Sequence, residues 1–130
     1  MQELSSPQIL ALCTHTPRLE IAVGNPHNYH HNHWELGRDL GKYIHMHLQA
    51  MMNGKPWFSL NAIGIGVGTG SYTGMRIGLT IVRTLGQQLH LPVYTVPEPD
   101  SAVMILGVID REMALGNFPH WSCAVPIYKD

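Results

Sequence analysis

The feature that most constrains this chain is an uncharged apolar run that ends in a cluster of glycines. Residues 62–67 (AIGIGV) are too few and too rich in glycine for a helix, and they predict a strand that is buried on both faces. Glycine supplies the backbone freedom for a sharp turn and a hydroxyl group can cap a helix, so the chain should turn here directly into a helix. The turn consists of Gly68, Thr69, Gly70, Ser71, Tyr72, Thr73 and Gly74.

The helix after this loop should run from residue 74 to about residue 90. Pro92 ends it, and residues 93–96 (VYTV) predict the next strand. A strand, a helix and a second strand in this order are typical of a parallel crossover, which is right-handed in nearly all proteins. The segment therefore predicts the centre of an α/β fold.

The glycine loop fits neither of the two common phosphate-binding motifs. A P-loop requires a lysine after its second glycine, but the chain has no lysine between Lys55 and Lys129. A dinucleotide fingerprint requires a third glycine where this loop has Thr73, and the acidic ribose ligand farther along the chain is missing. Two interpretations stay open. In the first, free amides at the start of the helix hold an anion. In the second, the glycines only permit a tight, closely packed turn.

The flanking segments complete a mixed sheet. Residues 8–14 and 19–24 are apolar, β-rich runs separated by a short turn, which suits an antiparallel hairpin. Helical patterns cover residues 34–52 and 102–115. Residues 117–130 contain two prolines and no sustained period, so we expect an extended closing segment.

Composition indicates one intracellular domain. With 130 residues and 45% apolar content, residues 1–130 can form a single core. Only 13% of residues are charged and the net charge is -1, so there is no basic field for direct nucleic-acid binding. Cys13 and Cys123 are typical of reduced thiols rather than of a disulfide framework. Neither a signal segment nor a membrane-length apolar stretch is found, and we expect a soluble, cytoplasmic protein.

The two longest helical patterns, residues 34–52 and 74–90, are apolar over a wide arc. On a helical wheel this arc spans about 200°, whereas one packing face needs about 100°. Both patterns carry glycines four residues apart, which would let another helix approach closely. Either the helices pack on each other and on the sheet, or part of the arc docks a second protein. We favour docking, with a partner interface formed by Gly37, Leu40, Gly41, Ile44, Leu48, Gly74, Ile77, Gly78 and Ile81.

A histidine-rich stretch at residues 27–33 (HNYHHNH) holds four of the nine histidines. Imidazole is a common zinc or nickel ligand, and His27 with His31 fits an H-x-x-x-H pattern. That pattern forms a site when a helix brings both rings to one face, but Pro26 precedes it and no cysteine or carboxylate lies within the stretch. We expect a solvated edge or loop here and no metal.

Several of these motifs resemble the bacterial TsaB family. The family's glycine block, A-x-G-x-GPGSFTGxRIG, stands here at residues 66–78 as GVGTGSYTGMRIG, and the strand that follows it stands at residues 91–96 as LPVYTV. The opening hairpin is similar to the family's LALDTST segment, with Cys13 and His15 in place of the aspartate and the serine. The resemblance implies that the loop residues Gly68, Thr69, Gly70, Ser71, Tyr72, Thr73, Gly74 and Arg76 form the family's glycine loop.

The resemblance also implies a fold, which is a single actin-like (ribonuclease H-like) lobe with about five strands and three helices. It places residues 27–33 on a short edge strand. It covers residues 8–102 and returns at residues 124–128 (AVPIY), without the family's second lobe between them. We therefore expect a one-lobe, short form of a TsaB protein.

TsaB proteins are thought to be non-catalytic dimerisation subunits of TsaD, which transfers threonylcarbamoyl to an adenosine of certain tRNAs. The resemblance implies the same role here, with a TsaD-like partner bound through first-lobe helices and a homodimer when that partner is lacking. It implies contact with tRNA only through the partner, no catalytic residue and no cofactor. The alternative is a nucleotide-binding or peptidase-like remnant, because the superfamily includes kinases and the family has been labelled glycoprotease-related. Cys13 argues against it, since a thiol cannot replace a magnesium-coordinating carboxylate.

Overall fold

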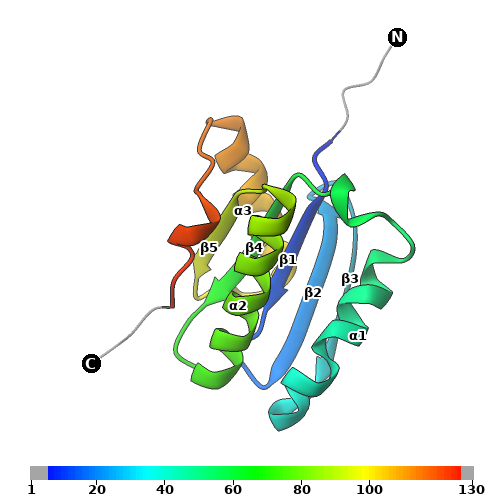
Figure 1. Cartoon of the computed structure of the whole chain (residues 1–130), viewed down its shortest axis with the longest axis vertical. Coiled ribbons are helices and arrows are strands. Elements are labelled where there is room, and N and C mark those ends of the chain that lie inside the picture. Colours follow the sequence, from blue (N-terminus) through cyan, green and yellow to red (C-terminus); the bar gives the residue numbers. More distant parts are fainter. Residues whose placement is uncertain (1–5, 127–130) are drawn as a thin grey trace.

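The computed structural model describes residues 6–126 and shows an α/β fold built on one mixed sheet (Figure 1). In chain order the strands and α-helices are β1 Ile9–Cys13, β2 Arg18–Asn25, β3 Asn28–Glu35, α1 Leu40–Met52, β4 Ala62–Val67, α2 Tyr72–Leu89, β5 Val93–Pro97 and α3 Ala102–Ala114. Short 3-10 turns lie at Gly37–Asp39, Trp57–Ser59 and Trp121–Cys123. None of the helices in this described part is long and apolar enough to cross a membrane.

The sheet has the strand order β3-β2-β1-β4-β5. β1 and β2 form the expected antiparallel hairpin, and β3 continues it as an antiparallel outer strand. β4 runs parallel to β1 and β5 runs parallel to β4, which confirms the parallel crossover through α2. The mixed five-stranded sheet with three α-helices confirms the fold class expected from the sequence.

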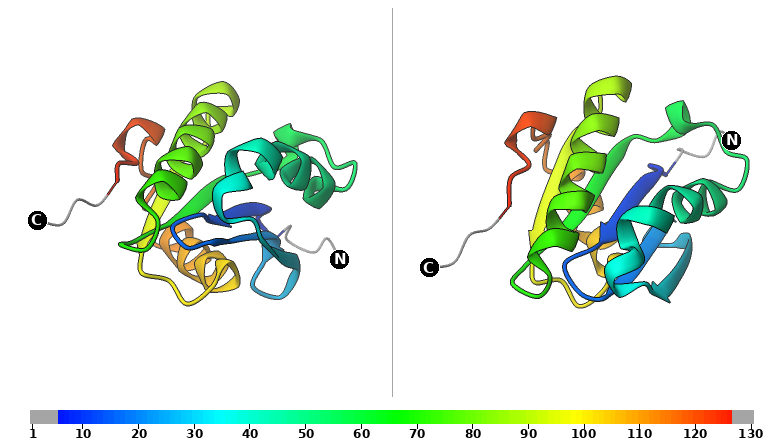
Figure 2. Two further views of the ribbon diagram at one scale, coloured as in Figure 1. Left: turned by 90° about the horizontal axis from the view of Figure 1, so that it is seen from below. Right: turned by 60° about the horizontal axis from the view of Figure 1, so that its bottom comes forward.

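The helices cover both faces of the sheet. Figure 2 shows α1 and α2 on one face and α3 on the other. The first face carries the larger core, where Leu12, Ile21 and Ile65 from the strands pack with side chains of α1 and α2. On the second face Ile9 and Ala11 of β1 pack with side chains of α3. Because the central strands are covered on both sides, all residues of β1 and β4 are buried, as the uncharged run AIGIGV predicted.

The sequence-based prediction was wrong at the start of the first helix. The helical pattern at residues 34–52 includes Trp34 and Glu35, but the structure places both on β3. β2 holds them there, since Arg18 pairs with Glu35 along the strand and its Nε donates to the carboxylate at 2.9 Å. Gly37 then adopts a left-handed φ of 51°, and α1 begins only at Leu40.

The other predicted boundaries agree closely with the structure. α2 begins at Tyr72, two residues earlier than expected, because Ser71 is its N-cap and its hydroxyl accepts from the Gly74 amide at 3.1 Å. α3 ends at Ala114 where residue 115 was expected. Of the predicted closing segment, residues 117–126 contain only one short 3-10 turn, and residues 127–130 lie outside the described part of the chain.

Candidate partner-binding groove and glycine loop

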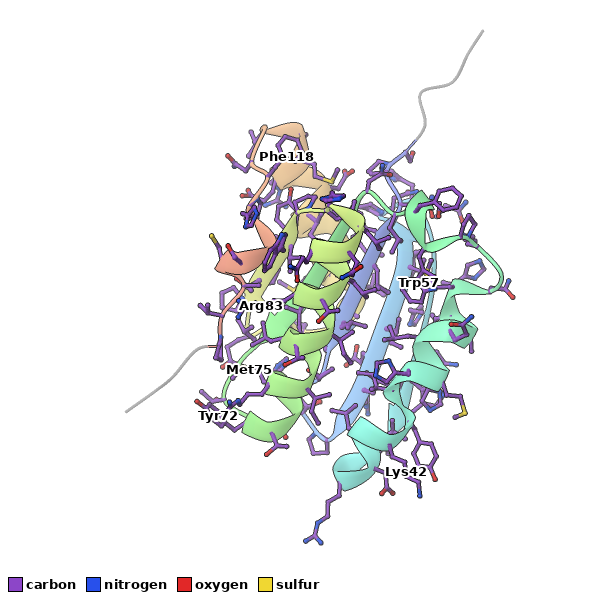
Figure 3. All side chains as sticks on the ribbon, viewed as in Figure 1. Lys42, Trp57, Tyr72, Met75, Arg83 and Phe118 are labelled. Atoms are coloured by element: carbon purple, nitrogen blue, oxygen red, sulfur yellow. The ribbon has the colours of Figure 1, made fainter. Side chains whose placement is uncertain are left out.

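A groove runs along the face of the domain between α1 and α2. The two helices approach each other at Gly41 and Ile77, where a Cβ added to the glycine would lie 3.5 Å from the isoleucine Cδ1. On either side of this contact the groove consists of three adjoining depressions of about 310, 550 and 420 Å³, which share lining residues. Figure 3 shows side chains of both helices reaching into this space, with Trp57 near the C-terminal end of α1.

The structure separates the nine predicted interface residues into two groups. Gly37 and Gly41 are exposed, and Ile77 and Ile81 are half-buried, so these four remain accessible on the side of the groove. The other five pack inside this chain, because the sheet lies beneath that part of the apolar arc. They are Leu40, Ile44, Leu48, Gly74 and Gly78. These five therefore make contacts within this chain, and the full set of nine residues stays a prediction of the partner interface.

The small residues of α2 serve contacts within the chain. A Cβ on Gly74 would lie 2.2 Å from the carbonyl oxygen of Thr14, and one on Gly78 would lie 2.2 Å from the Thr14 hydroxyl. Thr14 follows directly after β1 and is fully buried. The glycines thus let the first turns of α2 rest on the end of β1. For these glycines this agrees with packing of the helices within the chain, the alternative to docking of a second protein.

The groove also contains residues that were not part of the predicted interface. His45 and Thr80 line two of its depressions, and Thr84 and Leu85 extend it toward the end of α2. Arg38 and Arg76 also line it, and no carboxylate is found among the described lining residues. The signal that could have located them is the border between the apolar and polar arcs of each helix. A groove between two helices lies along that border.

The glycine loop is closed by contacts with its own neighbours. The carboxylate of Glu98 accepts from the Thr69 amide at 3.2 Å and from the Thr69 hydroxyl at 3.4 Å. A Cβ on Gly68 would lie 2.7 Å from His15 Cδ2 and 2.9 Å from a Glu98 carboxylate oxygen. The Ser71 amide donates to the His15 carbonyl. Since a carboxylate already occupies the loop, a bound anion would be repelled, and close packing explains the glycines better than anion binding.

The position that holds an aspartate in TsaB proteins is occupied by a buried thiol. Cys13 is 2% exposed at the end of β1. Burial raises the pKa of Cys13 to about 12, the carboxylate of Glu20 adds to this increase, and a backbone hydrogen bond from Gly66 opposes it. The neighbouring Thr14 Oγ1 and His15 Nδ1 are buried without a hydrogen-bond partner in the described part of the chain. At neutral pH the thiol is protonated, so it carries no negative charge that could bind a metal ion.

We expect the two cysteines to differ strongly in reactivity. Cys123 is exposed, whereas Cys13 is buried with a raised pKa, and only the thiolate is nucleophilic. In a colorimetric thiol assay at pH 8, one thiol per chain should react rapidly in the native protein and two in denaturant. Cys123→Ser should remove the rapid phase. Rapid reaction of both thiols without denaturant would contradict the buried position of Cys13.

The histidine-rich stretch lies on the outer strand β3. Strand pairing sets His30 opposite Val23 and His31 opposite Ala22, so the two rings point to opposite faces of the sheet. His27 lies in the turn before the strand. Within residues 6–126 no group of three histidine, cysteine or acidic side chains is positioned to hold a metal ion.

These features together define a class of protein. A mixed five-stranded sheet, an opening hairpin and a glycine loop leading into α2 form one lobe of the actin-like superfamily. A family model described as TsaD, tRNA N6-adenosine threonylcarbamoyltransferase, matches residues 44–125. The chain therefore belongs to this family of tRNA-modification proteins.

Solved structures with a similar fold include two from Pseudomonas aeruginosa. YeaZ from Pseudomonas aeruginosa is 25% identical with a TM-score of 0.66, and the match covers 70% of this chain and 44% of YeaZ. A second structure, of an uncharacterized Pseudomonas aeruginosa protein with similarity to peptidase YEAZ, gives the same identity and TM-score over 43% of its length. The chain thus spans less than half the length of either structure. No curated protein matches it. The likeness to YeaZ, a TsaB protein, confirms the resemblance found in the glycine block.

Proposed function

We propose that this chain is a non-catalytic subunit that binds a TsaD-like threonylcarbamoyltransferase through the groove between α1 and α2. In this role it would support threonylcarbamoyladenosine modification of tRNA in the cytoplasm. The observation that carries the proposal is the open groove, whose walls present the half-buried Ile77, Ile81 and Leu85. An apolar surface left open on a single domain usually marks an interface. Membership of a tRNA-modification family supports this choice of partner.

The charges of the groove specify the partner further. Arg38 and Arg76 line it, neither has an ion-pair partner within the described residues, and no lining carboxylate balances them. An interface is favoured when opposite charges meet. The docking surface of the partner should therefore be an apolar helix face flanked by acidic side chains.

The glycine loop supports a non-catalytic role. In the superfamily a carboxylate at the end of the first strand approaches the phosphate or the metal ion, whereas this chain has the buried thiol of Cys13 there. The Thr69 amide also already donates a hydrogen bond to the Glu98 carboxylate. With a net charge of -1, the chain offers tRNA no basic field, so contact with tRNA should come through the partner. Without the partner we expect homodimers.

Mixing the chain with the TsaD-like protein of the same source tests this function. Size-exclusion chromatography with light scattering should show a complex, and tRNA modification by the partner should depend on adding this chain. Calorimetry of the chain alone with ATP and magnesium should give no binding heat. If the chain forms no complex under any nucleotide condition, the scaffold role is wrong. If the chain alone binds or hydrolyses ATP, the enzyme-like alternative is correct.

A further inference from the structure

The two ends of the groove between α1 and α2 differ in chemistry. Residues around the starts of both helices line one end, and residues farther along both helices line the other. The two helices therefore run in the same direction. Figure 3 shows this, since Lys42 and Tyr72 lie at one end of the helix pair and Trp57 lies at the other. A protein that docks along the groove meets a different surface at each end.

The end near Trp57 is a pocket for an apolar group. This Trp57 pocket is the depression of about 310 Å³, and its apolar lining residues are Leu48, which is buried, and Trp57, Ile81 and Leu85, which are half-buried. Its other lining residues are exposed and polar, and they are His45, Gln49, Thr80 and Thr84. No lysine, arginine or carboxylate lines it within the described part of the chain. Because pockets for small molecules begin at about 300 Å³, this one has room for a single large side chain.

The opposite end of the groove carries positive charge. Arg38 and Arg76 line the depressions there, and both are exposed. The starts of α1 and α2 lie at this end, and the partial positive charge of a helix N-terminus adds to that of the arginines. Asp39 is exposed just before α1 but does not line these depressions, so it offsets the charge only in part. Acidic side chains are therefore favoured at this end.

The length of the groove defines a spacing in the partner. Arg76 and Leu85 are nine residues apart on α2. At about 1.5 Å per residue, this separation is about 14 Å, or roughly two and a half helical turns. A partner helix that follows the groove covers the same distance with the same number of residues.

We propose that the TsaD-like partner places one large apolar side chain in the Trp57 pocket and acidic side chains, about nine residues away on the same helix, against Arg38 and Arg76. This inference rests on the proposed function and adds the features by which the groove selects its partner. Large side chains buried in pockets commonly dominate binding energy, whereas charges at the border of an interface mainly accelerate association. The Trp57 pocket therefore controls the dissociation rate, and the arginines control the association rate.

Surface plasmon resonance with the TsaD-like protein of the same source tests the pocket. Thr84→Trp places an indole ring at the pocket, where it competes with the side chain of the partner, and it should raise the dissociation rate constant at least about tenfold. Trp57→Ala removes part of the lining and should change the same rate constant in the same direction. The matched control, Gln88→Trp, adds an indole ring to an exposed position of α2 outside the groove and should bind normally. Circular dichroism verifies that each variant is folded, and Thr84→Trp decides if Trp57→Ala is not.

The salt dependence of association tests the charged end. Arg76→Glu should lower the association rate constant about tenfold at low salt, and this difference should shrink as salt screens the charges. Thr84→Trp should keep the salt dependence of the unaltered chain, because it changes no charge. A loss of packing alone would not separate the two rate constants in this way.

Substitutions in the partner test the spacing. Alanine at one large apolar residue of the partner should cancel the effect of Thr84→Trp, because the two changes then act on the same contact. Lysine in place of an acidic residue about nine positions away should restore rapid association with Arg76→Glu.

The outcomes separate this inference from the proposed function. If Ile81→Asp weakens the complex while Thr84→Trp and Trp57→Ala bind with unchanged rate constants, the inference is wrong and the proposed function stands. A rescuing residue at a very different spacing also contradicts the inference. If the unaltered chain forms no complex with the TsaD-like protein, both the inference and the proposed function are wrong.

Discussion

Replacing Gly74 by alanine should lower the free energy of unfolding by about 3 kcal/mol. The new Cβ would lie 2.2 Å from the backbone carbonyl oxygen of Thr14 and 3.3 Å from Leu40 Cδ2. A backbone atom at the end of a buried central strand cannot move aside as a flexible side chain can. The whole first turn of α2 must therefore shift. Thermal unfolding followed by circular dichroism should show a decrease of roughly 10 °C.

Gly107→Ala is the matched control for this prediction. Gly107 lies inside α3, and a Cβ there meets nothing within 4 Å. Alanine is favoured over glycine within a helix, so this variant should gain about 1 kcal/mol. If both variants were stabilised, the close contact between α2 and the end of β1 would not exist in solution.

Replacing Ile81 by aspartate should weaken binding to the TsaD-like protein about 100-fold, which corresponds to roughly 2.7 kcal/mol. Ile81 lines two depressions of the groove and is only half-buried, so its side chain is available to a partner. A carboxylate there would have to lose its water in an apolar contact. Calorimetric titration with the partner measures the loss.

Two further variants make the groove result interpretable. Gln88→Asp adds the same charge to α2 outside the groove and should bind the partner normally. Gly41→Leu places a bulky side chain beside Ile77 without adding a charge, and it should also block docking. If Ile81→Asp and Gly41→Leu both bind the partner with unchanged affinity, the interface does not lie in the groove. Loss of fold in Ile81→Asp would leave Gly41→Leu as the deciding variant.

Local patterns were sufficient to predict most of the fold. The apolar runs around Pro17 predicted the hairpin, and the run AIGIGV followed by hydroxyl residues predicted a buried strand and a capped helix, in which Ser71 is the cap. The start of α1 was missed because a solvated outer strand has no clear apolar alternation, so Trp34 was grouped with the helix that follows. Pairing with β2 along its whole length holds that segment extended, and Trp34 stacks on His47 of α1.

The candidate site was less predictable than the fold. A helical wheel gives the width of an apolar arc but not the position of the sheet beneath it, so Ile44 and Ile81 were assigned to the same surface although only Ile81 is accessible. Glycines four residues apart are equally compatible with a partner helix and with Thr14 of the same chain. The contact of Glu98 with Thr69 links positions far apart in the sequence, and no local pattern signals it.

The close packing of α2 on the sheet should affect the rates of partner binding and the conformational entropy that binding costs. Gly74, Gly78 and Gly86 bring this helix so close to Thr14, Ile65 and Val93 that one wall of the groove has little room to tilt. A surface that is already in its binding shape loses little conformational entropy when a ligand arrives. Association should then resemble the docking of two rigid bodies, with differences in affinity among groove variants arising mainly from the dissociation rate.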